Sequence, residues 1–258
     1  EAMSTLGANS LSPPPPTLVV GMHNSGTSIL AEVLHRHGLF MGANMAHFEN
    51  RFFSIYVNDL QIMGGGSGWA QLPILTIDEV LAFRNTAGEV ILAQWLADFK
   101  TWGYDGQSPW GVKDPRMCVL LPLYLDLFPG ARVLHIIRDP DDVAASLAHR
   151  PKRGTGLLRD VDHWKQLAEA HVERVRDSVA GSGVEYLEIG YEEFCLEPQR
   201  VVERIFDFVE LPFGSDVGNF LDKNVSSSSV GTANRSGLQW KFASVSKRWR
   251  HRRGGDRH

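Results

Sequence analysis

The sequence predicts an α/β fold, a parallel β-sheet flanked by helices, with a helical insertion on one side of its ligand site. Two patterns carry this prediction. Short apolar runs alternate along the chain with longer segments of helical period. A glycine-rich loop also stands between the first apolar run and the first helical segment. Strands that alternate with helices favour parallel pairing through crossover connections.

Each expected element follows from its local pattern. Apolar runs predict strands over 18–20, 132–137 and 184–189, and a short strand over 110–112. Helical periodicity predicts helices over 27–37, 50–63, 77–102, 119–128, 139–149, 157–179 and 198–209. Gly38 and the Pro129-Gly130 pair supply helix stops. The stretch 39–50 has no clear period and is expected to be loop.

Composition limits the class of protein. The 258 residues are 43% hydrophobic and 22% charged, which is ordinary for a globular chain and too apolar for disorder. Cys118 and Cys195 are the two cysteines, which excludes a disulfide framework or a cysteine-rich zinc module and fits the reducing cytoplasm. No apolar run approaches 18 residues, so no membrane span is expected.

Charge is unevenly spread and suggests three regions. Residues 241–258 hold seven Lys and Arg against one Asp, whereas residues 1–240 hold 19 against 29 acidic residues. We expect a flexible proline-rich arm over 1–16, a single α/β domain over 17–240 and a basic tail over 241–258. The acidic body argues against a general nucleic-acid binder. The tail is either a solubilising end or a steering patch for an anionic acceptor or surface.

The loop Gly21–Ser28 has the spacing of a phosphate-binding loop, which makes the expected sheet P-loop-like. Its glycines let backbone N–H groups turn towards a phosphate, and the following helix adds positive potential at its N-terminus. Thr27 stands where a nucleoside-triphosphate loop has lysine, and Arg138 follows the 132–137 strand where a metal-holding Asp would be useful. The alternative is a glycine-containing turn that binds nothing.

Three further segments extend this pattern. They are Trp110–Arg116 with its Lys-Asp-Pro triplet, Arg138–Leu147 with Arg138 and Ser146 eight residues apart, and Glu49–Arg51. Together with Ser25-Gly26-Thr27, they resemble the sulfotransferases that use 3′-phosphoadenosine-5′-phosphosulfate (PAPS). The likeness covers residues 17–210 and is greatest to the bacterial and tyrosylprotein branches. The order of the four motifs is more specific than any one of them.

The resemblance implies a metal-free donor site that leaves adenosine 3′,5′-bisphosphate as product. Arg138 and Ser146 would bind the ribose 3′-phosphate, and Arg235, in a loosely matching C-terminal segment, would fold over it. Arg138 could instead pair with Asp139 or Asp142, and Ser146 could be a plain helix serine. The residues implied for the 5′-phosphosulfate are His23, Asn24, Ser25, Gly26, Thr27 and Ser28.

The resemblance also implies two catalytic groups. Glu49 would take the proton of the acceptor hydroxyl, with His47 as the rival base and His23 as a weaker third candidate. Lys113 would stabilise the sulfonate and the leaving group. Both residues also have non-catalytic interpretations. Glu49 could be a residue at the start of the 50–63 helix whose charge complements the helix dipole, and Lys113 could be a solvated lysine at the end of a strand. Many relatives carry Lys or Arg where this chain has Asn24, so one cation of the family's site is missing.

The acceptor is expected to be a small-molecule or carbohydrate hydroxyl compound. Ten aromatic residues lie between 52 and 110, and some of them could line its pocket. We expect Asp114 and Arg116 to pair with each other, and the segment 191–194 to serve packing. The excess of Arg over Lys hints at a bacterial source. Two other functions stay open: a nucleotide-binding protein of this type without catalysis, and a small-molecule kinase with a degenerate loop.

Overall fold

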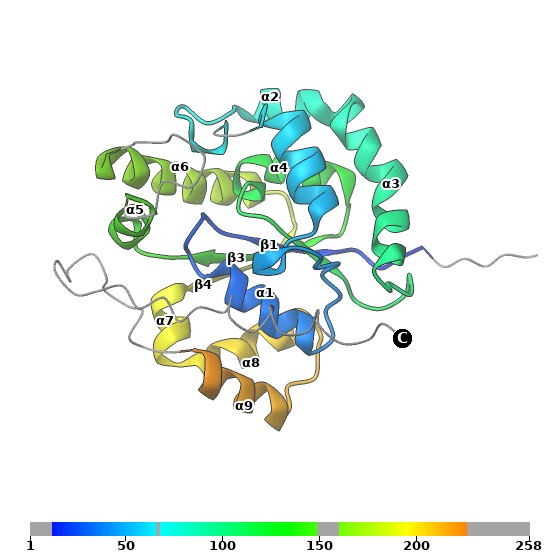
Figure 1. Ribbon diagram of the computed structural model, residues 1–258, viewed down its shortest axis with the longest axis vertical. Coiled ribbons are helices and arrows are strands. Elements are labelled where there is room, and N and C mark those ends of the chain that lie inside the picture. Colours follow the sequence, from blue (N-terminus) through cyan, green and yellow to red (C-terminus); the bar gives the residue numbers. More distant parts are fainter. Residues whose placement is uncertain (1–11, 66–67, 149–159, 226–258) are drawn as a thin grey trace, which may run out of the picture.

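A parallel sheet forms the centre of the computed structural model, which describes residues 12–65, 68–148 and 160–225 (Figure 1). Within these ranges the strand order is β2-β1-β3-β4, and every neighbouring pair is parallel. The strands are β1 (Thr17–Val20), β2 (Gly111–Lys113), β3 (Arg132–Ile137) and β4 (Glu185–Gly190). The predicted fold class is therefore confirmed.

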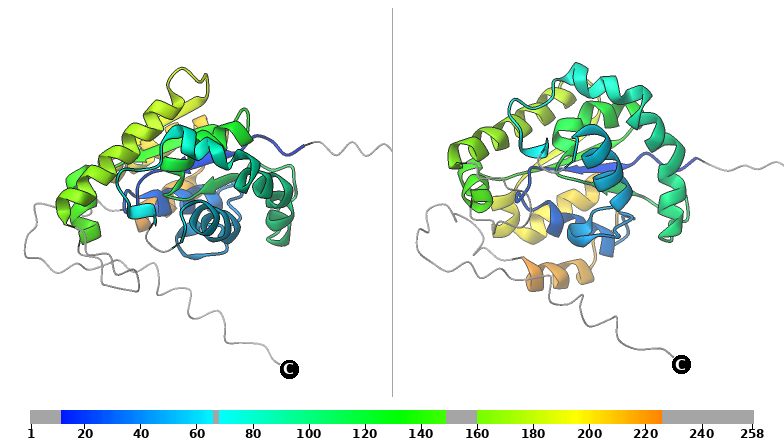
Figure 2. Two further views of the ribbon diagram at one scale, coloured as in Figure 1. Left: turned by 90° about the horizontal axis from the view of Figure 1, so that it is seen from above. Right: turned by 45° about the horizontal axis from the view of Figure 1, so that its top comes forward.

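Helices cover both faces of the sheet, because side chains alternate between the faces along each strand (Figures 1 and 2). Leu18 and Val20 face one apolar cluster, and Val19 faces the other. The first cluster is built with η2 (Phe52–Ile62), α2 (Ile77–Leu81), α3 (Ala87–Thr101), α4 (Met117–Leu127) and α6 (Val161–Val179). The second is built with α1 (Thr27–Arg36), α7 (Tyr191–Leu196), α8 (Pro198–Phe208) and α9 (Ser215–Asn224). Helix α5 (Pro140–Ala148) follows β3 and packs against α6.

The helical insertion differs in detail from its prediction. The expected single helix over 77–102 is wrong: α2 and the 3₁₀ turn η4 (Ala82–Asn85) end before Thr86, whose φ of −130° and ψ of −92° lie outside the helical region, and α3 starts afterwards. The expected helix over 50–63 is present as η2, but in the wider π-helical form. Short 3₁₀ turns, η1 (Ala46–Phe48) and η3 (Gly68–Ala70), interrupt the neighbouring loops.

Two glycines allow the loop after β1 to pack closely against its surroundings. A Cβ at Gly21 would lie 2.5 Å from the Ile136 carbonyl oxygen, inside van der Waals contact. Gly26 has a φ of 96°, and a Cβ there would lie 2.3 Å from the ring of Tyr191. No side chain is tolerated at either place without movement, so these glycines set how the loop sits between β1, β3 and α7.

Two buried histidines lie between β3 and α6. His135 on β3 has its Nδ1 2.9 Å from the hydroxyl of Tyr186, whereas both ring nitrogens of His171 on α6 have no hydrogen-bond partner within the described residues. Burial lowers the pKa of His135 to about 4 and that of His171 to about 3, and nearby Arg174 adds to the second shift. Both imidazoles are therefore neutral in the folded protein near pH 7.

We predict that the free energy of unfolding falls as the pH drops below 6.5. The unfolded chain takes up protons on both imidazoles near that pH, and the folded chain does so only near 4 and 3. At pH 5 this should cost about 2 kcal/mol per histidine relative to pH 7. Urea unfolding at the two pH values measures the loss, and His171→Leu should remove one histidine's share. An unchanged pH dependence in that variant would contradict the assignment.

We predict that Gly26→Ala destabilises the protein more than the control Gly103→Ala. Gly103 has a similar φ of 94°, but an added Cβ there meets no atom within 4 Å. Both variants pay for the left-handed backbone, and only Gly26→Ala also collides with Tyr191, at a further cost of about 1–3 kcal/mol. Equal midpoints in urea unfolding would mean that the close approach to Tyr191 is unimportant.

Candidate active site

The carboxyl ends of the four strands meet at one edge of the sheet, and the predicted site residues follow these ends. The glycine loop follows β1, Lys113 ends β2, Arg138 follows β3, and Tyr191 follows β4. Ligands of open parallel sheets bind at this edge. The sheet topology therefore brings residues that are far apart in the sequence to a common place.

The N-terminus of α1 is suited to an anion. Gly26 is its N-cap, and among the described residues no side chain caps this helix and no acidic residue stands in its first turn. Its first N–H groups and the positive end of the helix dipole are thus left for a ligand. Ser25 is buried and donates its hydroxyl hydrogen to the Met22 carbonyl (2.7 Å), which closes the loop on itself. Thr27 is also buried and begins the helix.

Arg138 and Ser146 converge on Asn24. Arg138 Nη1 donates to the Asn24 carbonyl oxygen at 3.0 Å, and the Asn24 amide donates to Ser146 Oγ at 2.9 Å. Asn24 has a φ of 67°, in the left-handed region that asparagine tolerates better than most residues. Arg138 also pairs with Asp142 at 3.4 Å, so the salt bridge considered as an alternative is present beside the contact with the loop.

Tyr191 contacts Arg138 of the candidate site, which the sequence alone did not reveal. The guanidinium of Arg138 lies over its ring, with Cζ 4.7 Å from the ring centroid. The same ring fills the space beside Gly26. The segment 191–194 was expected only to pack, although its position directly after a strand of the sheet was the signal that could have indicated a site role.

Lys113 and Glu49 form an ion pair beside the first turn of α1. Lys113 Nζ donates to Glu49 Oε1 at 2.8 Å, to the His47 carbonyl oxygen at 3.1 Å and to Ser28 Oγ at 3.4 Å. The Lys113 side chain is only 1% exposed, and that of Glu49 is 16% exposed. Three oxygen partners match the three donors of a buried ammonium, which offsets its loss of water. Lys113 is therefore not the solvated lysine of the alternative interpretation.

The other two candidate bases lie nearby but differ in setting. His47 is exposed in the 3₁₀ turn before Glu49, and it accepts the hydrogen bond from Lys113 with its backbone carbonyl oxygen. His23 is half-buried in the glycine loop, with its ring 4.0 Å from that of Trp69 between centroids. Trp69 in turn stacks on Trp164 at 5.6 Å. His23, which directly precedes Asn24 in the chain, thus connects the glycine loop to a pair of stacked tryptophans.

A buried polar network lies behind Lys113. Asp114 Oδ1 accepts hydrogen bonds from the backbone N–H of Arg116 at 2.9 Å and from its Nη1 at 3.1 Å, so the expected pairing of these two residues is confirmed. Asp114 Oδ2 accepts from the Asn58 amide at 3.0 Å. Within the Lys-Asp-Pro triplet, Lys113 therefore contacts the glycine loop and Asp114 contacts the helical insertion.

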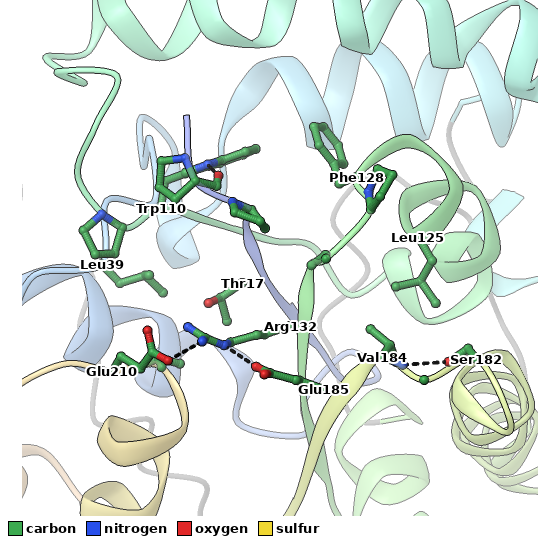
Figure 3. Close-up of a pocket in the computed structure, with 18 residues that line it drawn as sticks. Thr17, Leu39, Trp110, Leu125, Phe128, Arg132, Ser182, Val184, Glu185 and Glu210 are labelled. Carbon is green, nitrogen blue, oxygen red and sulfur yellow. Dashed lines mark hydrogen bonds and ion pairs between the residues drawn. The ribbon is translucent and has the colours of Figure 1, made fainter. Parts of the chain in front are cut away.

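A groove of about 730 Å³ lies at the opposite, amino edge of the sheet (Figure 3). The residues at the starts of three strands line it, namely Thr17, Arg132 and Glu185. Arg132 forms ion pairs there with Glu185 and Glu210, which neutralise it. None of the described residues predicted for donor binding or catalysis lines this groove. The polar residues suited to chemistry are gathered at the other end of the strands.

Some expectations fall outside the described ranges, including Arg235 and the basic tail 241–258. Within those ranges, no cluster of three or more His, Cys, Asp or Glu side chains is arranged to hold a metal ion. Among the helices described, none has the length and apolar character required to cross a membrane.

The chain is similar to proteins of one family. A sulfotransferase family model matches residues 15–215. An uncharacterized protein from Aquifex aeolicus (strain VF5) is 28% identical over 206 residues, which cover 77% of this chain and 26% of that protein. The chain thus spans about a quarter of the length of that relative.

Two solved structures share the fold. The sulfotransferase domain of the Synechococcus PCC 7002 olefin synthase has a TM-score of 0.57 at 18% identity, over 90% of both chains. The sulfotransferase domain from the curacin biosynthetic pathway has a TM-score of 0.53 at 16% identity, over 90% of this chain and 94% of that one. With the family model matching most of its length, the chain belongs to the sulfotransferase family.

Proposed function

We propose that this protein transfers the sulfuryl group of PAPS to a hydroxyl group of a small-molecule or carbohydrate acceptor. The observation that carries the proposal is the ion pair of Lys113 and Glu49, which lies against Ser28 in the first turn of the uncapped helix α1. A cation, a carboxylate and an anion-binding helix end are the three features that this reaction requires.

The donor is proposed to bind along the carboxyl edge of the sheet. The loop residues 23–28 and the α1 N-terminus would hold the 5′-phosphosulfate, and Arg138 and Ser146 the 3′-phosphate. Arg235 is proposed as a further 3′-phosphate contact. The fit is supported by the guanidinium and the hydroxyl that already converge on Asn24, since both are donors that suit a phosphate. Held there, the donor supplies an activated sulfuryl group, and no metal is proposed.

Glu49 is proposed as the general base, and Lys113 as the group that balances the developing negative charge. The acceptor hydroxyl gives its proton to the Glu49 carboxylate while its oxygen bonds to sulfur. The bond between sulfur and the bridging phosphate oxygen breaks, and adenosine 3′,5′-bisphosphate leaves. Because Asn24 brings no charge, Lys113 and the α1 N-terminus are the positive features assigned to the sulfonate.

An acceptor with a flat apolar or sugar face agrees with the aromatic contacts beside the loop. His23 packs on Trp69, and Trp69 stacks on Trp164. Trp164 is buried and Trp69 is only partly buried, so Trp69 is the tryptophan proposed to contact the acceptor. A reducing cytoplasmic setting agrees with Cys118 and Cys195, which are both buried and free.

We predict that adenosine 3′,5′-bisphosphate raises the melting temperature of the protein and that Arg138→Ala loses this shift. Loss of a charge-assisted contact to phosphate should weaken binding about 10- to 100-fold. Arg132→Ala is the matched control, because Arg132 stands at the other end of β3 in its own ion pairs. The donor site is wrong if wild-type protein shows no shift at millimolar nucleotide, or if Arg138→Ala keeps it.

We predict that Glu49→Gln lowers kcat by about 10²- to 10⁴-fold while adenosine 3′,5′-bisphosphate binds as before. Transfer of radiolabelled sulfate from PAPS to a panel of phenolic and carbohydrate acceptors measures kcat, and calorimetry measures binding. His47→Asn tests the rival base and should retain activity. If His47→Asn loses activity and Glu49→Gln retains it, His47 is the base. If the wild-type protein binds the nucleotide but transfers no sulfate, a non-catalytic protein is favoured.

A further inference from the structure

The π-helix η2 is connected to both of the proposed catalytic groups, Glu49 and Lys113. It begins at Phe52, three residues after Glu49, and its middle packs against the segment that contains Lys113 and Asp114. Long π-helices are rare, and π-helical turns concentrate at functional sites because they place side chains that a regular helix would not. Two asparagines associated with η2, Asn50 and Asn58, are almost fully buried.

Asn50 anchors the start of η2. Its Oδ1 accepts the backbone N–H of Phe53 at 3.1 Å. Its amide donates to the Gly42 carbonyl at 2.9 Å and to Asp98 Oδ2 at 2.9 Å. Because Asn50 directly follows Glu49, these three hydrogen bonds fix the backbone that presents the Glu49 carboxylate.

Asn58 anchors the middle of the same helix. Its Oδ1 accepts the hydroxyl hydrogen of Tyr124 at 2.7 Å, and its amide donates to Asp114 Oδ2 at 3.0 Å. Asn58, Asp114 and Tyr124 are each fully buried. Burial also raises the pKa of Tyr124, so its phenol stays protonated and remains a donor. Asp114 directly follows Lys113, so this second anchor fixes the backbone that presents the ammonium.

We infer that Asn58 and Tyr124 are positioning residues, which hold Lys113 against Glu49 through η2 and Asp114. The inference rests on the proposed function and assigns these two residues a part in it. A lysine side chain is long and flexible, so its backbone and its partners must be held for the ammonium to stay in one place. Displacement of a catalytic group by about 1 Å costs about 100-fold in rate.

Stability alone does not require this network. Buried polar networks are replaced by apolar groups of similar volume at little cost, or with a gain, when every member is replaced. What such a network provides is one defined arrangement, because any other leaves buried donors and acceptors unpaired. If the network next to Lys113 fixes the position of the ammonium, its loss should lower kcat. A kinetic experiment can measure that loss separately from the loss of stability.

Tyr124→Phe tests the inference, with Tyr104→Phe as the matched control. Tyr104 is also buried and donates its hydroxyl hydrogen to one acceptor, the Ser108 carbonyl at 2.9 Å. Both variants lose one hydroxyl, but Tyr124→Phe should lose more melting temperature, because it leaves the buried Asn58 Oδ1 without a donor whereas Ser108 is only partly buried. We expect kcat to fall about tenfold in Tyr124→Phe only, with affinity for adenosine 3′,5′-bisphosphate unchanged. Equal kcat in the two variants would overturn the inference.

A double-mutant cycle shows whether Tyr124 acts through Lys113. In a Lys113→Ala background, Tyr124→Phe should lower kcat no further, because the group that it positions is absent. A second tenfold loss in that background would overturn the inference.

A cycle of Tyr124→Phe with Glu49→Gln in urea unfolding needs no activity at all. The two substitutions should change the free energy of unfolding non-additively. Strictly additive changes would contradict the positioning role of Tyr124. If wild-type protein transfers no sulfate to any acceptor, the proposed function fails and this unfolding cycle still decides the positioning.

Discussion

The ammonium of Lys113 must be matched by oxygen atoms because it is buried at the end of a strand. A charge withdrawn from water is tolerated only where partners surround it closely. Here the three partners come from two segments: the Glu49 carboxylate and the His47 carbonyl from one turn, and the Ser28 hydroxyl from α1. This one requirement ties β2, the insertion and the glycine loop together. The proposed chemistry uses the same contacts, so the group that would bind the sulfonate also organises the site.

The fold was predictable to the extent that local pattern decides it. Strands β1 and β3 are apolar runs buried between two helical layers, and such runs stand out in a sequence. Helix α7 was missed because its six residues are too few to show a period. The break at Thr86 and the π-helical form of η2 could not be predicted. The elements on either side of Thr86 pack against α4, and η2 contacts α4 through Asn58 and Tyr124, which are 66 positions apart.

The candidate site was partly predictable for a different reason. Glu49, Lys113, Arg138 and Ser146 are members of motifs, and parallel topology requires the residues at strand ends to meet. Asn58 belonged to no motif that we used, Asn50 stood in the Glu49–Arg51 motif without an assigned role, and Tyr191 was expected only to pack. Their importance comes from contacts between distant segments, and a buried asparagine looks like any other asparagine in a sequence.

An acidic chain can bind the anionic donor proposed for it if positive charge is concentrated at the site, because local charge rather than net charge decides binding. The chain carries a formal charge of −4, yet Lys113, Arg138 and the N-terminus of α1 lie at one edge of the sheet. The ion pairs with Glu49 and Asp142 keep these cations neutralised in the described structure. An anion that binds there has to compete with these carboxylates for Lys113 and Arg138.

A crystal structure with adenosine 3′,5′-bisphosphate tests the central claim most directly. The account predicts a 5′-phosphate at the N-terminus of α1, a 3′-phosphate within hydrogen-bond distance of Arg138 and Ser146, and Lys113 facing the space beyond the 5′-phosphate. Nucleotide bound in the groove at the amino edge of the sheet, or bound without contact to the glycine loop, would contradict it.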